Sequence, residues 1–375
     1  MISIEKVDLN NKEQVNRFIQ IPFRLYANHP QWVPPFISDI KVMMNPAKHP
    51  FYEHSAAEFY IARADGRDVG RIAALENTLF NKCHETKDAE FYLFDCEDDQ
   101  DIANTLFERA FEWARNRGCN KVVGPKGFSA FDGYGIQVEG FEHRQMMNMM
   151  NYNYPYYSKL VENLGFEKEV DFVSCYLDME KVHFPDKVHL AAEKILKRGT
   201  FWVKRFTKKS ELVAMANEIG QAYNNTFINN WEYYPFTKRE IKFILDNLLT
   251  VADPRLIKII MHKERVVGFL LAFPDVSTSM QRGKGKLNPL SIYRLFREMR
   301  TTRWVSLNGA GILPEFQGIG GNLLLYSEME KTVRDYNFKH ADLTQVAETA
   351  KNLRQDLINV GGEAYKNHRV YRRSI

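Results

Sequence analysis

The stretch GILPEFQGIGGNLLLYSEMEK, Gly311 to Lys331, decides the fold of this chain. Four glycines fall within its first eleven residues, between a run that predicts a buried strand and a periodic run that predicts a helix. A glycine-rich turn from strand to helix leaves the first N–H groups of the helix without intrahelical partners, at the positive end of the helix dipole. Such a turn is typical of anion-binding loops, and Gln317 adds a side-chain donor. The alternative is a tight turn that binds nothing.

Three classes of phosphate-binding loop compete for this turn. A P-loop requires Gly-Lys-Ser/Thr at its end, but Gly321 is followed by Asn322-Leu323. A dinucleotide fingerprint requires a third glycine near Leu323 and an acidic residue after the next strand, and neither is present in convincing form. Gln317-Gly318-Ile319-Gly320-Gly321-Asn322 resembles motif A of the GNAT family of acyl-CoA-dependent N-acetyltransferases, Gln/Arg-x-x-Gly-x-Gly/Ala, with Asn322 as the departure.

This resemblance implies that acetyl-CoA or a longer acyl-CoA is the co-substrate, with no metal ion. The residues that this resemblance assigns to acyl-CoA binding are Gly311, Ile312, Leu313, Gln317, Gly318, Ile319, Gly320, Gly321 and Asn322.

The order hairpin, strand, helix occurs twice in the chain. Phe59–Glu76 and Ile257–Phe273 both predict hairpins, and Val69-Gly70 of the first corresponds to Val267-Gly268 of the second. Two copies of one unit fit the 375-residue length, with chance recurrence as the alternative. We therefore predict an α/β (α+β) fold of tandem GNAT-like domains, each a mixed, mostly antiparallel twisted sheet flanked by helices. The expected division is 1–182, a linker at 183–200, and 201–375.

The first copy lacks the glycines of the second. Its corresponding run is FDCEDDQDIAN, in which Glu97, Asp98, Asp99 and Asp101 would repel a diphosphate. We expect domain 201–375 to bind acyl-CoA, and domain 1–182 to serve as a scaffold or to bind the acceptor.

The wider chain resembles a subgroup of two-domain bacterial GNAT-like proteins. The stretches that carry this resemblance are Phe23–Phe36, Asp65–Ala74, Gly124–Phe141 and Asn151–Lys168. The subgroup resembles bacterial acyltransferases that N-acylate long-chain amino alcohols, and this resemblance implies an amine-bearing small molecule or lipid-like acceptor. Gly133 departs from it, since an acidic neighbour to Asp132 is expected there.

Three residues are candidates for catalysis. Glu348 follows the strand ADLTQV and is a candidate general base, or else a carboxylate near a helix N-terminus. Asp132 lies among glycines and could bind the ammonium of the acceptor or cap a turn. The tyrosine acid usual in the family falls on Leu357, so Tyr365 is the candidate replacement; the other readings are unassisted thiolate departure or an inactive domain.

The second copy carries a basic insertion, Gln281–Arg303. A helix from Pro289 would place Leu290, Tyr293 and Phe296 on one face and arginines on the other. The basic amphipathic pattern leaves two roles open for 287–303: a lid packed on its own domain, or a peripheral membrane contact.

Composition excludes several classes of protein. The chain has 51 basic and 47 acidic residues, a net charge of +4, which with the absence of interleaved aromatics in the insertion argues against nucleic-acid binding. It has no signal peptide and no apolar run of about 18 residues, so a cytoplasmic protein, peripheral at most to the inner membrane face, is expected. Two functions remain: an N-acyltransferase, or an inactive acyl-CoA sensor or partner-binding protein.

Overall fold

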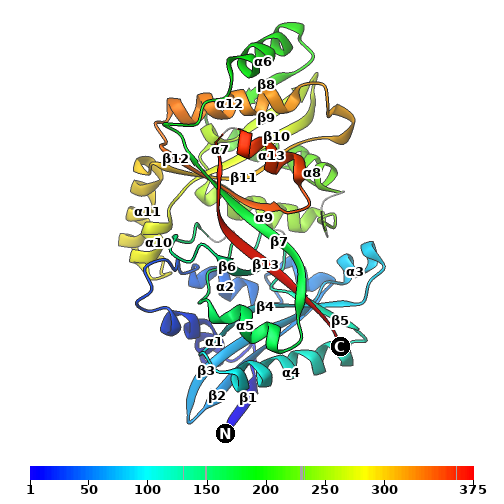
Figure 1. Cartoon of the computed structure of the whole chain (residues 1–375), viewed down its shortest axis with the longest axis vertical. Helices are drawn as coiled ribbons and strands as arrows, with labels where there is room; N and C mark the ends of the chain where they lie inside the picture. The colour runs from blue at the N-terminus through cyan, green and yellow to red at the C-terminus, as the bar shows by residue number, and fades with distance from the viewer. Residues whose placement is uncertain (130, 148–149, 229–230, 232, 360) are drawn as a thin grey trace. The chain divides into compact units, whose positions relative to one another are not determined.

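The computed structural model describes residues 1–375 except 130, 148–149, 229–230, 232 and 360 (Figure 1). The chain divides into two compact units, each assembled from separate segments. The first unit is Met1–Val173, Ser277–Phe296 and Tyr365–Ile375, and the second is Ser174–Val276 and Arg297–Ala364. This division differs from the expected one, because 277–296 and 365–375 belong to the first unit and the expected linker 183–200 belongs to the second.

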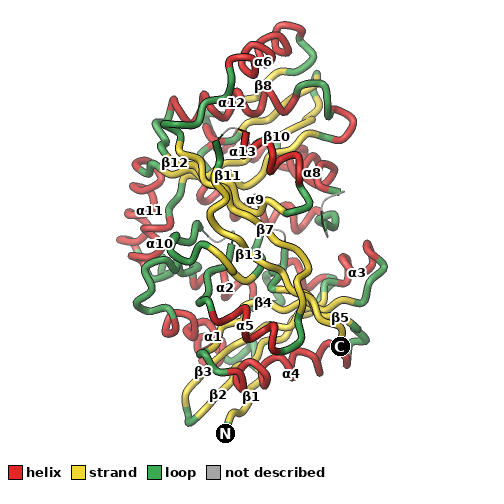
Figure 2. The backbone as a smooth tube through the Cα atoms, in the orientation of Figure 1, coloured by secondary structure: helices red, strands yellow, loops and turns green. Residues whose placement is uncertain are grey.

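The first unit is built around a sheet with helices on both faces (Figure 2). Its helical elements are α1 (Lys12–Leu25), α2 (Ile37–Met43), η1 (Pro50–Glu53), α3 (Thr78–His84), α4 (Gln100–Asn116), α5 (Tyr156–Asn163) and α10 (Ser277–Gly283). Its strands are β1 (Ile2–Lys6), β2 (Ala56–Ala64), β3 (Arg67–Glu76), β4 (Asp88–Cys96), β5 (Lys121–Gly124), β6 (Ile136–Glu139) and most of β13 (Glu363–Ser374). Strand β7 (Glu167–Asp178) and helix α11 (Pro289–Thr301) each contain a boundary between the two units.

The strand order of the first unit is β1-β2-β3-β4-β5-β13, and β6 also pairs with β13. The β4–β5 pair is parallel and the other pairs are antiparallel. Side chains alternate between the two faces of the sheet, because successive residues of a strand point in opposite directions. Tyr60 and Ala62 pack with α4 on one face, while Phe59 and Ile61 pack with α1 and α2 on the other.

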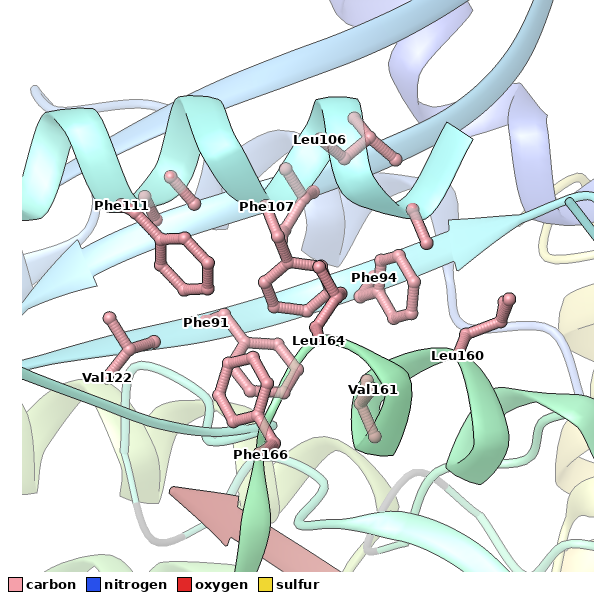
Figure 3. Packing of buried hydrophobic residues seen from close by; sticks show 14 of the residues in the cluster. Phe91, Phe94, Leu106, Phe107, Phe111, Val122, Leu160, Val161, Leu164 and Phe166 are labelled. Atoms are coloured by element: carbon pink, nitrogen blue, oxygen red, sulfur yellow. The ribbon is translucent and has the colours of Figure 1, made fainter. Parts of the chain in front are cut away.

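Aromatic side chains fill the core beneath α4 (Figure 3). The rings of Phe91 in β4 and Phe107 in α4 have centroids 4.9 Å apart, and Phe166 lies 5.2 Å from Phe107. All three are buried, and α4 presents Leu106, Phe107 and Phe111 to this core at helical spacing. Helix α4 ends at Asn116, just before Gly118.

The second unit repeats this plan. Its helical elements are α6 (Asp186–Arg198), α7 (Lys209–Ala214), α8 (Ala216–Phe227), α9 (Lys238–Val251), η2 (Pro254–Leu256), η3 (Pro314–Phe316), α12 (Gly321–Asp335) and α13 (Lys351–Asn359). Its strands β8 (Trp202–Arg205), β9 (Lys258–His262), β10 (Arg265–Pro274), β11 (Trp304–Ile312) and β12 (His340–Ala347) follow the order β12-β11-β10-β9-β8. Only the β11–β12 pair of these described strands is parallel. The predicted fold class is therefore confirmed: in each unit the strands pair in a mixed, mostly antiparallel arrangement flanked by helices.

The register of the two sheets confirms the internal repeat. Gly70 lies opposite Cys96 in the β3–β4 pair, and Gly268 lies opposite Ile312 in the β10–β11 pair. In both units the residue that follows this pair donates a backbone hydrogen bond to the preceding strand of the hairpin. Glu97 N donates to Val69 O in β3 (3.0 Å), and Leu313 N donates to Val267 O in β10 (2.8 Å). A helix follows at once in both cases, α4 in the first unit and α12 in the second.

None of the helices formed by the described residues is both long and apolar enough to cross a bilayer.

Candidate active site

The turn between β11 and α12 is held in a conformation that suits glycine. Gly318 has φ +75° and Gly320 has φ +100°, both in the region that side chains rarely adopt. Gly321 serves another purpose, because a Cβ at this position would lie 2.9 Å from Cδ1 of Ile312. The glycines therefore combine a left-handed turn with a close approach of helix and strand.

The N-terminus of α12 is open to an anion. Gly320 is its N-cap, and among the described residues no side chain caps the first turn and no acidic residue lies in it. Leu324 N donates to Gly320 O (3.3 Å), so the N–H groups of Gly321, Asn322 and Leu323 precede the first intrahelical bond. These groups form the positive end of a helix of fifteen residues.

The strand that leads into this turn pairs with β12 over only part of its length. β11 and β12 pair from Trp304–His340 to Leu307–Leu343, and among the described residues β11 pairs only with β10 beyond Leu307. Asn308 is the extra residue of a β-bulge, since Leu271 lies opposite Gly309 and Ala272 opposite Leu307. Because Leu313 N points to Val267 on β10, the alternation of an antiparallel ladder directs the N–H of Ile312 toward the opposite edge.

In the first unit the corresponding helix N-terminus is already occupied. Asp99 is the N-cap of α4, and its Oδ1 accepts hydrogen bonds from Asp101 N (2.8 Å) and Ile102 N (3.4 Å). The chain therefore supplies its own anion at the place where α12 offers unpaired donors.

The strand edge in the first unit is closed as well. Cys96 is the counterpart of Ile312 by register, and Cys96 N donates to the hydroxyl of Tyr157 (2.9 Å). The hydroxyl of Tyr156 donates to Cys96 O (2.7 Å). Tyr157 is itself buried in the core of the first unit.

Comparison with known proteins agrees with this architecture. No family model matches the chain. A solved tandem GNAT protein from the clavulanic acid biosynthesis pathway superimposes with a TM-score of 0.56 at 12% identity, covering 100% of this chain and 98% of that one. The chain has a tandem GNAT fold.

Two curated bacterial proteins are similar to this chain over nearly its whole length. The bacterial ceramide synthase of Caulobacter vibrioides is 27% identical over 376 residues, which cover 98% of this chain and 97% of the synthase. Protein YghO of Escherichia coli is 25% identical over 371 residues, which cover 97% and 94%. The chain is homologous to both.

Of the residues expected to act in GNAT chemistry, Glu348 lies in the second unit. It is half-buried in the turn after β12, the strand that separates from β11. Leu357, which stands where a tyrosine acid is usual, is buried in α13, and its carbonyl accepts a hydrogen bond from Gly362 N (2.8 Å). The position is thus part of the packing between α13 and the glycine turn that follows.

Asp132 and Tyr365 both lie in the first unit. Asp132 Oδ2 accepts hydrogen bonds from Ser129 N (2.8 Å) and Ser129 Oγ (3.2 Å), the contacts of a capped turn. Burial raises the pKa of this carboxyl to about 6. The ring of Tyr365 packs edge-on against His143, with centroids 4.9 Å apart, and carries Lys366 Nζ 4.5 Å from its centroid. The three catalytic candidates are therefore divided between the two units.

Gln317 has a partner within the chain. Its Nε2 donates to Ile312 O (3.0 Å), so this amide ties the end of β11 to the turn. Asn322 and Ile319 are exposed on the same turn.

Two residues beside the turn were missed by sequence reasoning. A Cβ on Gly311 would lie 2.3 Å from Cγ2 of Thr226 in α8, whose buried Oγ1 has no hydrogen-bond partner among the described residues. On the other side of the sheet, a Cβ on Gly320 would lie 2.3 Å from Cδ1 of Ile195 in α6. Both come from helices distant in sequence, and Ile195 lies in the segment that was expected to be a linker.

Proposed function

We propose that the chain is an acyl-CoA-dependent N-acyltransferase whose second unit binds the acyl-CoA. The observation that carries this proposal is the uncapped N-terminus of α12, behind the left-handed Gly318 and Gly320. The N–H groups of Gly321, Asn322 and Leu323 would hold the diphosphate. The corresponding helix N-terminus of the first unit, that of α4, is capped by Asp99. This supports a single acyl-CoA site in each chain.

The end of β11 beyond Leu307, which among the described residues pairs with β10 only, suits the pantetheine arm of acyl-CoA. Amides of the pantetheine arm would add to this edge as a further strand does, next to the N–H of Ile312. That N–H would then donate to the thioester carbonyl oxygen as negative charge develops on it. An amine nitrogen forms the new C–N bond, the C–S bond breaks, and the electron pair leaves on the thiolate sulfur. Glu348 is the proposed acceptor of the proton that the amine gives up.

The proposed acceptor is a lipid-like primary amine such as a long-chain amino alcohol. Homology to a bacterial ceramide synthase over almost the whole of both chains supports this class. The acyl donor is acetyl-CoA or a longer acyl-CoA. Asp132 and Tyr365 belong to the first unit, and their proposed role is on the acceptor side of the reaction.

A second candidate function is acyl-CoA binding without catalysis. Leu357 favours it, because a buried leucine has no proton to give to the departing thiolate. The two functions share the carrier site and differ in turnover alone.

The test measures binding and turnover separately. Calorimetric titration with CoA and acyl-CoAs of increasing length should show binding that the Gly320→Ala variant loses. Thiol release should occur with long-chain amino alcohols and fall by about 10²-fold or more in Glu348→Gln, the range given by loss of a general base. Glu315→Gln, on the exposed η3 turn, is the matched control that should keep full activity. Absence of CoA binding contradicts both functions, and binding without release on any amine favours the sensor.

A further inference from the structure

The insertion in the second copy exposes a cluster of large apolar side chains. Tyr293 is 63% exposed and Leu290 55%, and Leu287, Ile292 and Phe296 are exposed as well. Five of the large hydrophobic side chains that the described residues expose thus fall within ten consecutive positions. Single exposed apolar residues are ordinary, but a contiguous group indicates contact with something apolar. We name these five residues the α11 face.

Basic side chains share this exposed surface. Helix α11 buries Ser291 and Leu295, whereas Arg297 and Arg300 are exposed. At about 100° per residue, Arg297 and Arg300 project on the same side as Leu290, Tyr293 and Phe296. This corrects the expectation of apolar residues on one face and arginines on the other. Further exposed basic residues flank the helix at Arg282, Lys284, Lys286 and Arg303.

The insertion is fixed to the first unit by specific contacts. Gln281 Nε2 donates to Pro30 O (2.8 Å) and Trp32 O (2.9 Å), and Ile37 N donates to Gly285 O (2.9 Å). Gly285 has φ +67°, and a Cβ there would lie 2.4 Å from Pro35 O. The start of the insertion therefore packs on residues 30–37 of the first unit and not on domain 201–375, as the expected lid would, while the α11 face remains outside this packing.

The chemistry of the surface selects its partner. Seven basic residues and one acidic residue, Glu298, lie between Gln281 and Arg303, so the partner must carry negative charge and accept apolar side chains. An anionic bilayer offers both, with phosphates for the basic groups and the acyl boundary for the apolar side chains. We propose that the α11 face binds the surface of anionic membranes and inserts its apolar side chains at headgroup depth.

This inference goes beyond the proposed function, because binding to vesicles requires neither acyl-CoA nor turnover. The experiment uses the full chain with vesicles of equal parts phosphatidylcholine and phosphatidylglycerol, and with vesicles of phosphatidylcholine alone, in a co-sedimentation assay. We expect binding to the anionic vesicles only, weakened in 0.5 M salt because surface charge is screened within about 3–5 Å there.

Two variants separate the apolar and basic contributions. Leu290→Ser with Phe296→Ser should lower the partition coefficient at least tenfold, since two inserted side chains are lost. Arg297→Gln with Arg300→Gln should lower it roughly 25-fold, since one basic residue near an anionic surface contributes about fivefold. Leu190→Ser is the matched control, because Leu190 on α6 is 57% exposed and lies outside the α11 face; it should bind as the unchanged chain does.

Three results would overturn the proposal: no binding of the unchanged chain, equal binding to both kinds of vesicle, or equal losses in Leu190→Ser and the α11 variants. Sedimentation velocity without lipid provides a further check. If the chain self-associates and Leu290→Ser with Phe296→Ser abolishes this, the α11 face is a subunit interface and the membrane assignment is wrong. Far-ultraviolet circular dichroism confirms that each variant retains its helices.

Discussion

Gly320 has two constraints that differ in cost. Its φ of +100° disfavours any side chain, whereas the clash of a Cβ with Ile195 involves the flexible end of that side chain. We predict that Gly320→Ala lowers the free energy of unfolding by about 1–2 kcal/mol and abolishes measurable CoA binding, because the turn must change shape. Gly66→Ala is the control, since Gly66 has φ +76° and open space around it. Urea unfolding and calorimetry should show similar destabilisation but unchanged CoA binding for Gly66→Ala.

Asp132 gives a pH-dependent prediction. Its pKa of about 6 lies above the unfolded value of 3.8, so the folded state binds the additional proton between these pH values. Stability from this group is therefore complete below about pH 4 and falls as the pH rises through 6. Asp132→Asn should be more stable than the unchanged chain by roughly 1–3 kcal/mol at pH 7, with the difference vanishing near pH 4. Urea unfolding at both pH values measures it, and a constant difference between the chains would contradict the assignment.

Residue roles were only partly predictable from sequence. The spacing of Gln317 to Gly321 indicated the turn, and Gly318 and Gly320 do adopt left-handed conformations. Sequence gave no indication that Gln317 Nε2 bonds to Ile312 O, because this contact depends on how sharply the chain reverses after β11. The division of Asp132 and Glu348 between two units was equally invisible, since it depends on which segments pack together.

At the scale of elements, α6 is anchored to α12 by one histidine. His189 Nδ1 lies 2.9 Å from Ser327 Oγ, and His189 Nε2 lies 2.9 Å from Glu330 Oε2. Removing the ring leaves two buried polar groups of α12 with fewer partners. We predict that His189→Ala lowers the free energy of unfolding by about 1–3 kcal/mol and speeds amide exchange in Asp186–Arg198. His143→Ala is the control, because that side chain is 42% exposed; equal destabilisation by both would contradict a specific anchor.

Helices and strands with a strong apolar period were predicted well. Features that depend on contacts with residues distant in sequence were not. The two hairpins and the helices α4 and α12 formed where the pattern indicated them. Helix α11 also formed, but its period could not tell which side would be buried, and Ser291 and Leu295 face inward. The expected linker 183–200 contains α6, because Ile195 and His189 find partners on and before α12 that lie more than 100 residues away.

At the scale of the whole molecule, two similar units with one open helix terminus predict the stoichiometry. Calorimetric titration with acyl-CoA should give one site for each chain. In the first unit the corresponding backbone N–H groups already donate hydrogen bonds to the side chains of Asp99 and Tyr157. Asp99→Ala should cost about 1 kcal/mol of stability and leave the stoichiometry at one, since the neighbouring acidic residues still repel a diphosphate. Two equivalent sites in the unchanged chain would contradict this account.

The repeat itself was predictable, whereas the assignment of segments to units was not. The matching dipeptides Val69-Gly70 and Val267-Gly268 are local features, so the repeat that they mark can be recognised in the sequence. That β13 pairs with β5 depends on a partner strand roughly 250 residues earlier, which no local pattern specifies.

The pairing of β13 with β5 has a consequence during protein synthesis. Val123 and Gly124 emerge from the ribosome long before Tyr371 and Arg372, their partners in the sheet. At about 5–20 residues per second, the nascent chain spends roughly 10–50 s with this edge of β5 unprotected while the whole second unit is translated. Such an edge can pair with foreign strands, so a chaperone could bind β5 during this interval, until β13 has emerged and paired with it.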